Sequence, residues 1–429
     1  MSALSARKRS YTLSVEGFGF ALLCLALCAC GGGPDTRQGG GRFDPVRQET
    51  PTDPDKPPEI RREAKGYFME AVRAAQAGQR ERAVDLLKEA IEEDERFAEA
   101  YFNIGVLLEA EGDEQGAIEW YEKSATYGTK FGEGIVRIGL IHQRAGRHGE
   151  AEGTFERAHQ VQPFNGRAHL NLALIRLRRD DSEGAIKEVR NALKENSANP
   201  DAYDVLCQIY YKMKRYRLAE LVCQAGLENF DRNHPGLNNS FGLVRLKLQE
   251  VNKAIILFKA ALKADPDHVA ALMNLGAITF GYRDYEQSYA LFRRALERAP
   301  KNQEARLSKA VAARALGRID EAQQLYQEIL SVNPRDERVF FNQGVIAYQS
   351  QNYDEAIRLY GEALNYATDD AVRARFSKAL DNVRQEKEAL AEAAAAEAEA
   401  RAEEAAEAAE AAAEAAAEGG AEGGAPAAQ

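Results

Sequence analysis

Side chains that could carry out chemistry are few in this chain and stand apart from one another. No pair of its histidines follows the His-Glu-x-x-His spacing or another pattern that groups metal ligands on one helix face. The regular part of the sequence also contains neither a phosphate-binding glycine loop nor a serine nucleophile elbow. The six histidines are His142, His148, His159, His169, His234 and His268. The sequence therefore predicts a protein that is not an enzyme, with no catalytic residue, no metal site and no cofactor.

Two cysteines are candidates for a disulfide. Cys207 and Cys223 lie in the same stretch of the chain, on two helices that we expect to face each other. An oxidising compartment would allow them to form a disulfide. Reduced, both would act as small apolar residues that fill the core. Geometry decides between these alternatives, and the sequence leaves both open.

The element that must position any functional residue is a repeat of 34 residues. A small residue recurs at this interval, with a single step of 35 between Ala219 and Ala254. A fixed period in this range indicates a stacked array of helical units, which offers a long surface rather than a pocket of reactive groups. The nine small residues are Ala83, Ala117, Ala151, Ala185, Ala219, Ala254, Ser288, Ala322 and Ala356.

Each repeat has the pattern of two antiparallel helices. Around Ala117, for example, a bulky residue, Tyr121, follows four places later and a second small residue, Gly105, stands twelve places earlier. Small residues on two helices let the backbones approach, and the bulky residue fills the seam between them. Glycines such as Gly112 can end the first helix in a left-handed conformation, and prolines such as Pro163 stop the second. The sequence therefore predicts an all-α chain of helical hairpins.

This pattern resembles the tetratricopeptide repeat, in which aromatic, small and proline residues occupy the same offsets. The resemblance covers residues 61–370 and implies a right-handed α-solenoid of about nine hairpins. Repeat six, near Pro235–Asp267, departs most from the pattern, because Asn238 replaces an aromatic residue and one extra residue precedes it.

In this family the first helices line a peptide-binding groove, and the resemblance transfers that role to matching places here. We expect an apolar peptide segment or helix of another protein as the ligand, and no nucleic acid. For about half of these residues, packing against the next repeat is an equally good interpretation. The expected groove residues are Phe102, Asn103, Val106, Leu140, Asn171, Leu174, Tyr211, Leu243, Met273, Asn274, Phe280, Val311, Phe341, Asn342 and Val345.

The N-terminus has the pattern of an export signal. Basic residues at positions 7–9 precede an apolar run of about ten residues, which is too short to span a bilayer. The run ends Leu27-Cys28-Ala29-Cys30 and resembles a bacterial lipobox. That resemblance implies a lipoprotein signal peptide at 1–29, lipid attachment at Cys30 and a flexible tether over 30–60. It also favours the periplasmic face of the outer membrane. An ordinary cleaved signal peptide is the alternative.

The C-terminus is a low-complexity segment. Residues 371–385 carry an apolar stripe (Val372, Phe376, Ala379, Val383) that is suited to cap the last repeat. Residues 386–429 are rich in alanine and glutamate, and their twelve Glu against Lys387 and Arg401 account for −10 of the net charge of −11. Alanine favours helix, so we expect a partly helical rod that breaks at Gly419. A solvated tail without function is the favoured interpretation over a spacer or a contact for a basic partner.

Together these features predict a lipid-anchored periplasmic scaffold that binds another envelope protein and helps to assemble or localise a multiprotein machine. The combination is similar to the repeat lipoproteins that act as pilotins in type IV pilus assembly, and to those of myxobacterial gliding motility. An adaptor that holds a cell-wall synthase or hydrolase at the envelope is the alternative.

Overall fold

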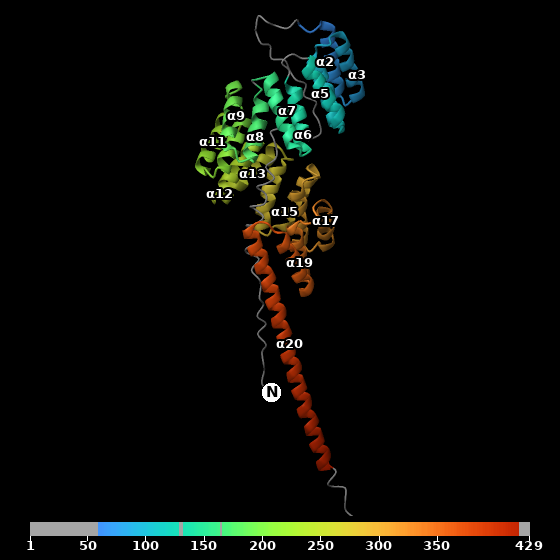
Figure 1. Ribbon diagram of the computed structural model, residues 1–429, viewed down its shortest axis with the longest axis vertical. Coiled ribbons are helices and arrows are strands. Elements are labelled where there is room, and N and C mark those ends of the chain that lie inside the picture. Colours follow the sequence, from blue (N-terminus) through green and yellow to red (C-terminus); the bar gives the residue numbers. More distant parts are fainter. Residues whose placement is uncertain (1–58, 128–131, 164, 420–429) are drawn as a thin grey trace, which may run out of the picture. The chain divides into compact units, whose positions relative to one another are not determined.

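The computed structural model describes residues 59–127, 132–163 and 165–419, with side chains as far as residue 413. Cys30, the predicted signal peptide and most of the predicted tether lie outside this range. Within it the structure contains nineteen α-helices and no strand, which confirms the predicted all-α fold (Figure 1).

The helices follow one another in nine pairs, one for each predicted repeat, and α20 (Asp370–Gly419) comes after them. The pairs of repeats one to five are α2 (Arg62–Gln76) and α3 (Arg80–Glu93), α4 (Ala98–Glu111) and α5 (Glu114–Tyr127), α6 (Glu133–Arg144) and α7 (His148–Val161), α8 (Gly166–Arg178) and α9 (Ser182–Glu195), and α10 (Pro200–Lys212) and α11 (Tyr216–Asn229). Those of repeats six to nine are α12 (Pro235–Lys247) and α13 (Val251–Ala264), α14 (Val269–Gly281) and α15 (Tyr285–Arg298), α16 (Gln303–Ala315) and α17 (Ile319–Val332), and α18 (Glu337–Gln349) and α19 (Tyr353–Tyr366).

The chain divides into two compact units. The first runs to Arg283 and also includes Glu297–Pro300, and the second comprises Asp284–Leu296 and the chain from Lys301 onward. In both units the two helices of a repeat pack together, as α10 does on α11 and α18 on α19. First helices of neighbouring repeats also touch, as in α8 with α10, α10 with α12, and α16 with α18.

Close packing within a hairpin depends on the paired small and bulky residues. The ring of Tyr121 lies against Gly105, and that of Phe258 lies in the same way against Gly242. A Cβ at either glycine would fall within 2.6 Å of the ring, closer than ordinary van der Waals contact. Tyr121 and Phe258 are fully buried. The small residue therefore sets how near the two helices come, as the sequence predicts.

The turn between the two helices has the same backbone conformation in every repeat. A residue with positive φ stands five places before the repeat's small residue in all nine cases. Four of these residues are Gly78, Gly112, Gly146 and Gly317, with φ between 76° and 87°. The other five are Asp180, Lys214, Gln249, Arg283 and Gln351, with φ between 59° and 63°. The requirement for a left-handed residue is thus met without glycine in five turns.

The connection before α12 is one residue longer than those before α10 and α14. Five residues, Phe230–His234, join α11 to α12, whereas four join α9 to α10 and α13 to α14. The extra residue of repeat six is therefore accommodated in this loop, and it leaves the helices of repeats five and six at their usual length.

Helix α20 caps the last repeat and then continues as one uninterrupted helix (Figure 1). Phe376, Leu380 and Val383 are buried in the core of repeat nine, where the Phe376 ring stacks on Phe341 with centroids 4.5 Å apart. Glu386 accepts hydrogen bonds from the hydroxyl groups of Tyr348 (2.6 Å) and Tyr353 (3.3 Å). The docked part of α20 thus reaches beyond the predicted boundary at residue 385. The described side chains from 388 to 413 are all exposed.

Candidate functional site

The first helices of the repeats share one face, on which a residue recurs at the same place in every repeat. We call the residue 15 places before each small residue the first-helix row. Seven of its nine members are apolar and buried, and two are polar. The row is Phe68, Phe102, Val136, Leu170, Asp204, Asn239, Met273, Leu307 and Phe341.

Most of the expected groove residues are buried. Val106, Tyr211, Asn342 and Val345 keep partial exposure. The others pack between helices, which corrects the expectation of an exposed apolar lining for them. The physical reason is close packing between helices: within a unit, first helices of neighbouring repeats touch, as α8 does with α10 and α16 with α18. The buried residues are Phe102, Asn103, Leu140, Asn171, Leu174, Leu243, Met273, Asn274, Phe280, Val311 and Phe341.

Three of the four asparagines one place after the row form hydrogen bonds within the protein. The side-chain amides of Asn171 and Asn342 each donate to a backbone carbonyl one turn earlier, at 2.9 and 2.7 Å. Asn274 donates to the side-chain oxygen of Asn239 at 2.9 Å. Asn103 is fully buried, and neither polar atom of its amide has a hydrogen-bond partner. In this structure these amides therefore do not present themselves to an approaching peptide backbone.

Three ion pairs on the first helices join neighbouring repeats. Arg144 bonds Glu109 of the preceding repeat at 2.6 Å, and Arg167 pairs with Glu133 in the same manner. In the second unit Arg338 pairs with Glu304. Partners about one period apart thus neutralise each other along this face.

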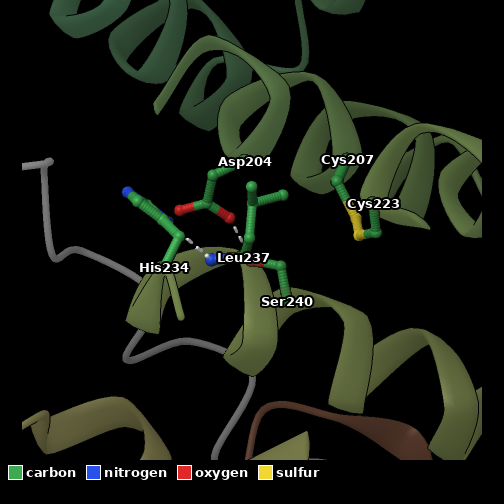
Figure 2. Close-up of a disulfide and its surroundings, with 6 residues drawn as sticks. All are labelled: Asp204, Cys207, Cys223, His234, Leu237 and Ser240. Atoms are coloured by element: carbon green, nitrogen blue, oxygen red, sulfur yellow. Dashed lines mark hydrogen bonds between the residues drawn. A yellow bond between two sulfur atoms is a disulfide. The ribbon is translucent and has the colours of Figure 1, made fainter. Parts of the chain in front are cut away.

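Repeats five and six interrupt the apolar row with polar side chains (Figure 2). Asp204 of α10 faces the first two turns of α12, where the Ser240 hydroxyl donates a hydrogen bond to its Oδ1. Gly236 makes room for the carboxylate, since a Cβ there would collide with Oδ2. Asn239 is the next member of the row and is 5% exposed. The row is therefore polar in two adjacent repeats and apolar in the others.

The environment of Asp204 disfavours its charge. Burial raises the pKa of Asp204 above its ordinary value, while hydrogen bonds from Ser240 and Gln208 and the nearby His234 act in the opposite direction. The side chain still keeps partial exposure. It is thus a largely desolvated carboxylate on a residue that is not fully buried.

His234, the last residue of the five-residue loop before α12, contacts the acidic residues of α10. Its Nδ1 accepts a hydrogen bond from the backbone N–H of Leu237 at 3.1 Å and so caps α12. Its Nε2 lies 2.9 Å from Oδ1 of Asp201. Burial opposes the charged imidazole, but Asp201 and Asp204 outweigh it and raise the pKa of His234. The inserted residue therefore lies in the loop that delivers His234 to Asp201.

A disulfide lies one helical turn from Asp204 (Figure 2). Cys207 of α10 and Cys223 of α11 are bonded, with their Cα atoms 5.5 Å apart, and both are fully buried. Of the two alternatives left open by the sequence, the structure contains the disulfide. It ties together the two helices of the repeat that carries Asp204.

Asp204, Asn239 and Ser240 were not among the residues predicted from the sequence, although a signal was available. Writing the repeats under one another shows a column that is apolar in seven repeats and polar in two. A lining predicted from apolar residues does not include the two polar members of this column, Asp204 and Asn239.

Two absences hold for the described residues alone. In that part of the chain no group of three or more His, Cys, Asp or Glu side chains is arranged to hold a metal ion. None of the helices there is both long enough and apolar enough to cross a membrane.

Comparisons with known proteins agree with the architecture. A family model described as the cytochrome c-type biogenesis protein H TPR domain matches residues 242–374, and a tetratricopeptide-repeat model matches residues 68–128 and 136–203. No curated protein sequence matches the chain.

Among solved structures, human IFIT1 as a dimer with m7Gppp-AAAA is 18% identical with a TM-score of 0.52, and the match covers 76% of this chain and 82% of that one. TTC0263, a TPR protein of Thermus thermophilus, is 24% identical with a TM-score of 0.38, over 42% of this chain and 98% of its own. Pseudomonas aeruginosa PilF is 17% identical with a TM-score of 0.39, over 51% of this chain and 97% of its own. The likeness to IFIT1 shows the fold alone. With the repeat models matching in both halves of the array, the chain belongs to the tetratricopeptide-repeat proteins, whose helical hairpins serve as scaffolds for binding other proteins.

Proposed function

We propose that the chain is a lipid-anchored scaffold of the bacterial envelope that binds a segment of another envelope protein on its first-helix face. It thereby assembles or localises a multiprotein machine, of the kind that drives gliding motility or builds type IV pili. The observation that carries the binding role is the presence of partly exposed apolar side chains on first helices, namely Val106 and Tyr211 in the first unit and Val345 in the second. Such side chains favour an apolar peptide ligand.

A peptide is favoured over a nucleic acid by the state of the arginines. IFIT1 is described with m7Gppp-AAAA, which is a property of that protein. On this chain Arg144, Arg167 and Arg338 are each paired with a carboxylate of the preceding repeat. Phosphate binding would require cations that are available to the ligand.

Export is supported by the disulfide and by the N-terminal motif. Disulfides persist in oxidising compartments such as the bacterial periplasm, and Cys207–Cys223 is buried in the core of repeat five. Cys30 follows Leu27 and Ala29 in the spacing of a lipobox. Substituting Cys30→Ser should release the protein from the membrane fraction, and unchanged membrane retention would exclude lipid anchoring at this residue.

Partner capture tests the binding face. We expect Val106→Lys combined with Val345→Lys to abolish recovery of crosslinked envelope proteins from the native source while the array stays folded. The matched control is Leu221→Lys on the second helix of repeat five, an apolar residue that is 63% exposed. Loss of recovery in the control, or its persistence in the double variant, would contradict the proposed face. Recovery of cell-wall synthases or hydrolases with the unaltered chain would replace the motility or pilus role by that of a wall-enzyme adaptor.

A further inference from the structure

The polar interruption of the first-helix row indicates what the bound segment carries. The row is apolar in seven repeats and places a carboxylate, Asp204, in repeat five. An apolar side chain at that place would pack like its equivalents Leu170 and Met273, which are 1% and 2% exposed. Core packing alone gives no reason for the aspartate, and the carboxylate lies among groups that hold it in position.

Asp204 also differs from the three first-helix carboxylates that bridge neighbouring repeats. Glu109, Glu133 and Glu304 each pair with an arginine of the next repeat. Asp204 accepts hydrogen bonds from Ser240 and Gln208, and His234, which bonds Asp201, acts on its charge. Among the described residues no lysine or arginine forms an ion pair with Asp204. Its charge is therefore balanced less well than that of Glu109, Glu133 or Glu304.

The carboxylate is held rigidly before any ligand arrives. Cys207, one turn along α10, is bonded to α11. Ser240 and Gly236 fix the opposite side from α12. A desolvated and fixed acceptor has already met most of the cost of ordering and dehydration, so a cation placed against it would gain more than at a solvated surface carboxylate.

We propose that Asp204 is the subsite for a cationic side chain, lysine or arginine, of the protein segment that binds the first-helix face. The inference rests on the proposed function, because it assumes that a peptide lies on this face. The segment would then combine apolar residues with one basic residue that reaches repeat five.

A random dodecapeptide library displayed on phage tests this, with the full-length protein immobilised from detergent solution. The unaltered chain should select apolar peptides enriched in lysine or arginine at one position. Asp204→Asn should select apolar peptides without that enrichment, since Asn retains an acceptor for Ser240 but carries no charge. Asp85→Asn on α3, whose side chain is 73% exposed, is the charge-matched control and should behave like the unaltered chain.

The second part of the test measures the affinity of one selected peptide for the unaltered chain and for Asp204→Asn. Asp204→Asn should weaken its binding about tenfold or more, as should replacing its basic residue by glutamine, and the two changes together should cost no more than either alone. Equal enrichment of basic residues by Asp204→Asn, or selected peptides without them, would overturn the subsite and leave peptide binding intact. Failure of the unaltered chain to select any peptide would overturn the proposed function and the subsite with it.

Discussion

Phe155 lies so close to Gly139 that a Cβ on the glycine would stand 2.5 Å from its ring carbon Cε1. The ring is fully buried in the seam of repeat three. The glycine has ordinary helical backbone, so its importance is the space that it leaves and not its conformational freedom. The hairpin seam therefore depends on the absence of a single methyl group.

Gly139→Ala should destabilise the array by about 1–3 kcal/mol, because the added methyl group overpacks the seam. The matched change in the same repeat is Gly153→Ala, where a Cβ would meet no atom within 4 Å. That substitution should stabilise α7 by roughly 0.5–1 kcal/mol, since alanine loses less entropy in a helix. Urea unfolding followed by circular dichroism measures both. Equal effects of the two substitutions would contradict the packing described for the seam.

Reduction of the Cys207–Cys223 disulfide should lower stability. The bonded residues are 16 apart, and closing a loop of this size stabilises by about 3 kcal/mol in the chain-entropy model. The unfolding midpoint of native-source protein should fall when reductant is added. A double variant, Cys207→Ala with Cys223→Ala, should not respond to reductant. Alkylation of both thiols without prior reduction, detected by mass spectrometry, would show that the native protein lacks the bond.

Phe376→Ala should remove much of the cap on repeat nine. Its ring is 1% exposed and stacks on Phe341, so we expect a loss of about 3–5 kcal/mol in the free energy of unfolding. Leu390→Ala on the same helix is the control, because Leu390 is 49% exposed and should change stability by less than about 0.5 kcal/mol. A large effect of Leu390→Ala would mean that α20 is docked further along than described.

Asp94 should support the fold at neutral pH. Its side-chain bond with Arg96 and the backbone N–H groups of Arg61 and Arg96 lower the pKa of Asp94, against a smaller opposing effect of burial. A lowered pKa in the folded state stabilises above the pKa of the unfolded chain, and this stabilisation is lost as pH falls through the folded value. Asp94→Asn should therefore be less stable than the unaltered chain at neutral pH, with a deficit that shrinks on acidification. Guanidinium unfolding across acidic and neutral pH measures this, and a constant deficit would contradict it.

The contribution of Asp204 to stability should change with pH in the opposite direction to that of Asp94. Because its pKa is raised in the folded state, the folded chain holds the proton more tightly than the unfolded chain. Ionisation of Asp204 then costs stability as pH rises above its ordinary value. Asp204→Asn should gain stability relative to the unaltered chain between acidic and neutral pH, as measured by the same guanidinium unfolding. A carboxylate that weakens the fold at neutral pH fits a role in binding, and a relative loss with rising pH would argue for a structural role.

Much of the fold could be predicted from the sequence, because spacing fixes which residues share a helix face. The small residues from Ala83 to Ala356 located all nine helix pairs. Glycine identified only four of the turns. Lys214 and Gln249 adopt the same left-handed conformation as Gly78, although neither residue type favours it.

The candidate site was predicted less well, for a physical reason. Spacing places Leu174 and Leu243 on the face of the first helices, but it does not say how closely the next repeat approaches, and both prove buried. The pairing of Cys207 with Cys223 likewise depended on a distance between helices. Asp204 could have been found, because a polar residue in an otherwise apolar column is visible in the sequence alone.

The five-residue loop Phe230–His234 has a consequence for how a ligand is aligned. A strictly periodic surface would offer a bound segment several equivalent positions, each displaced by one repeat, and the segment could slip between them. The longer loop and the carboxylate of Asp204 fall in adjacent repeats. They make one alignment different from all the others, as a single polar residue does in a coiled coil. The irregular repeat would thus fix the register in which a bound segment lies along the array.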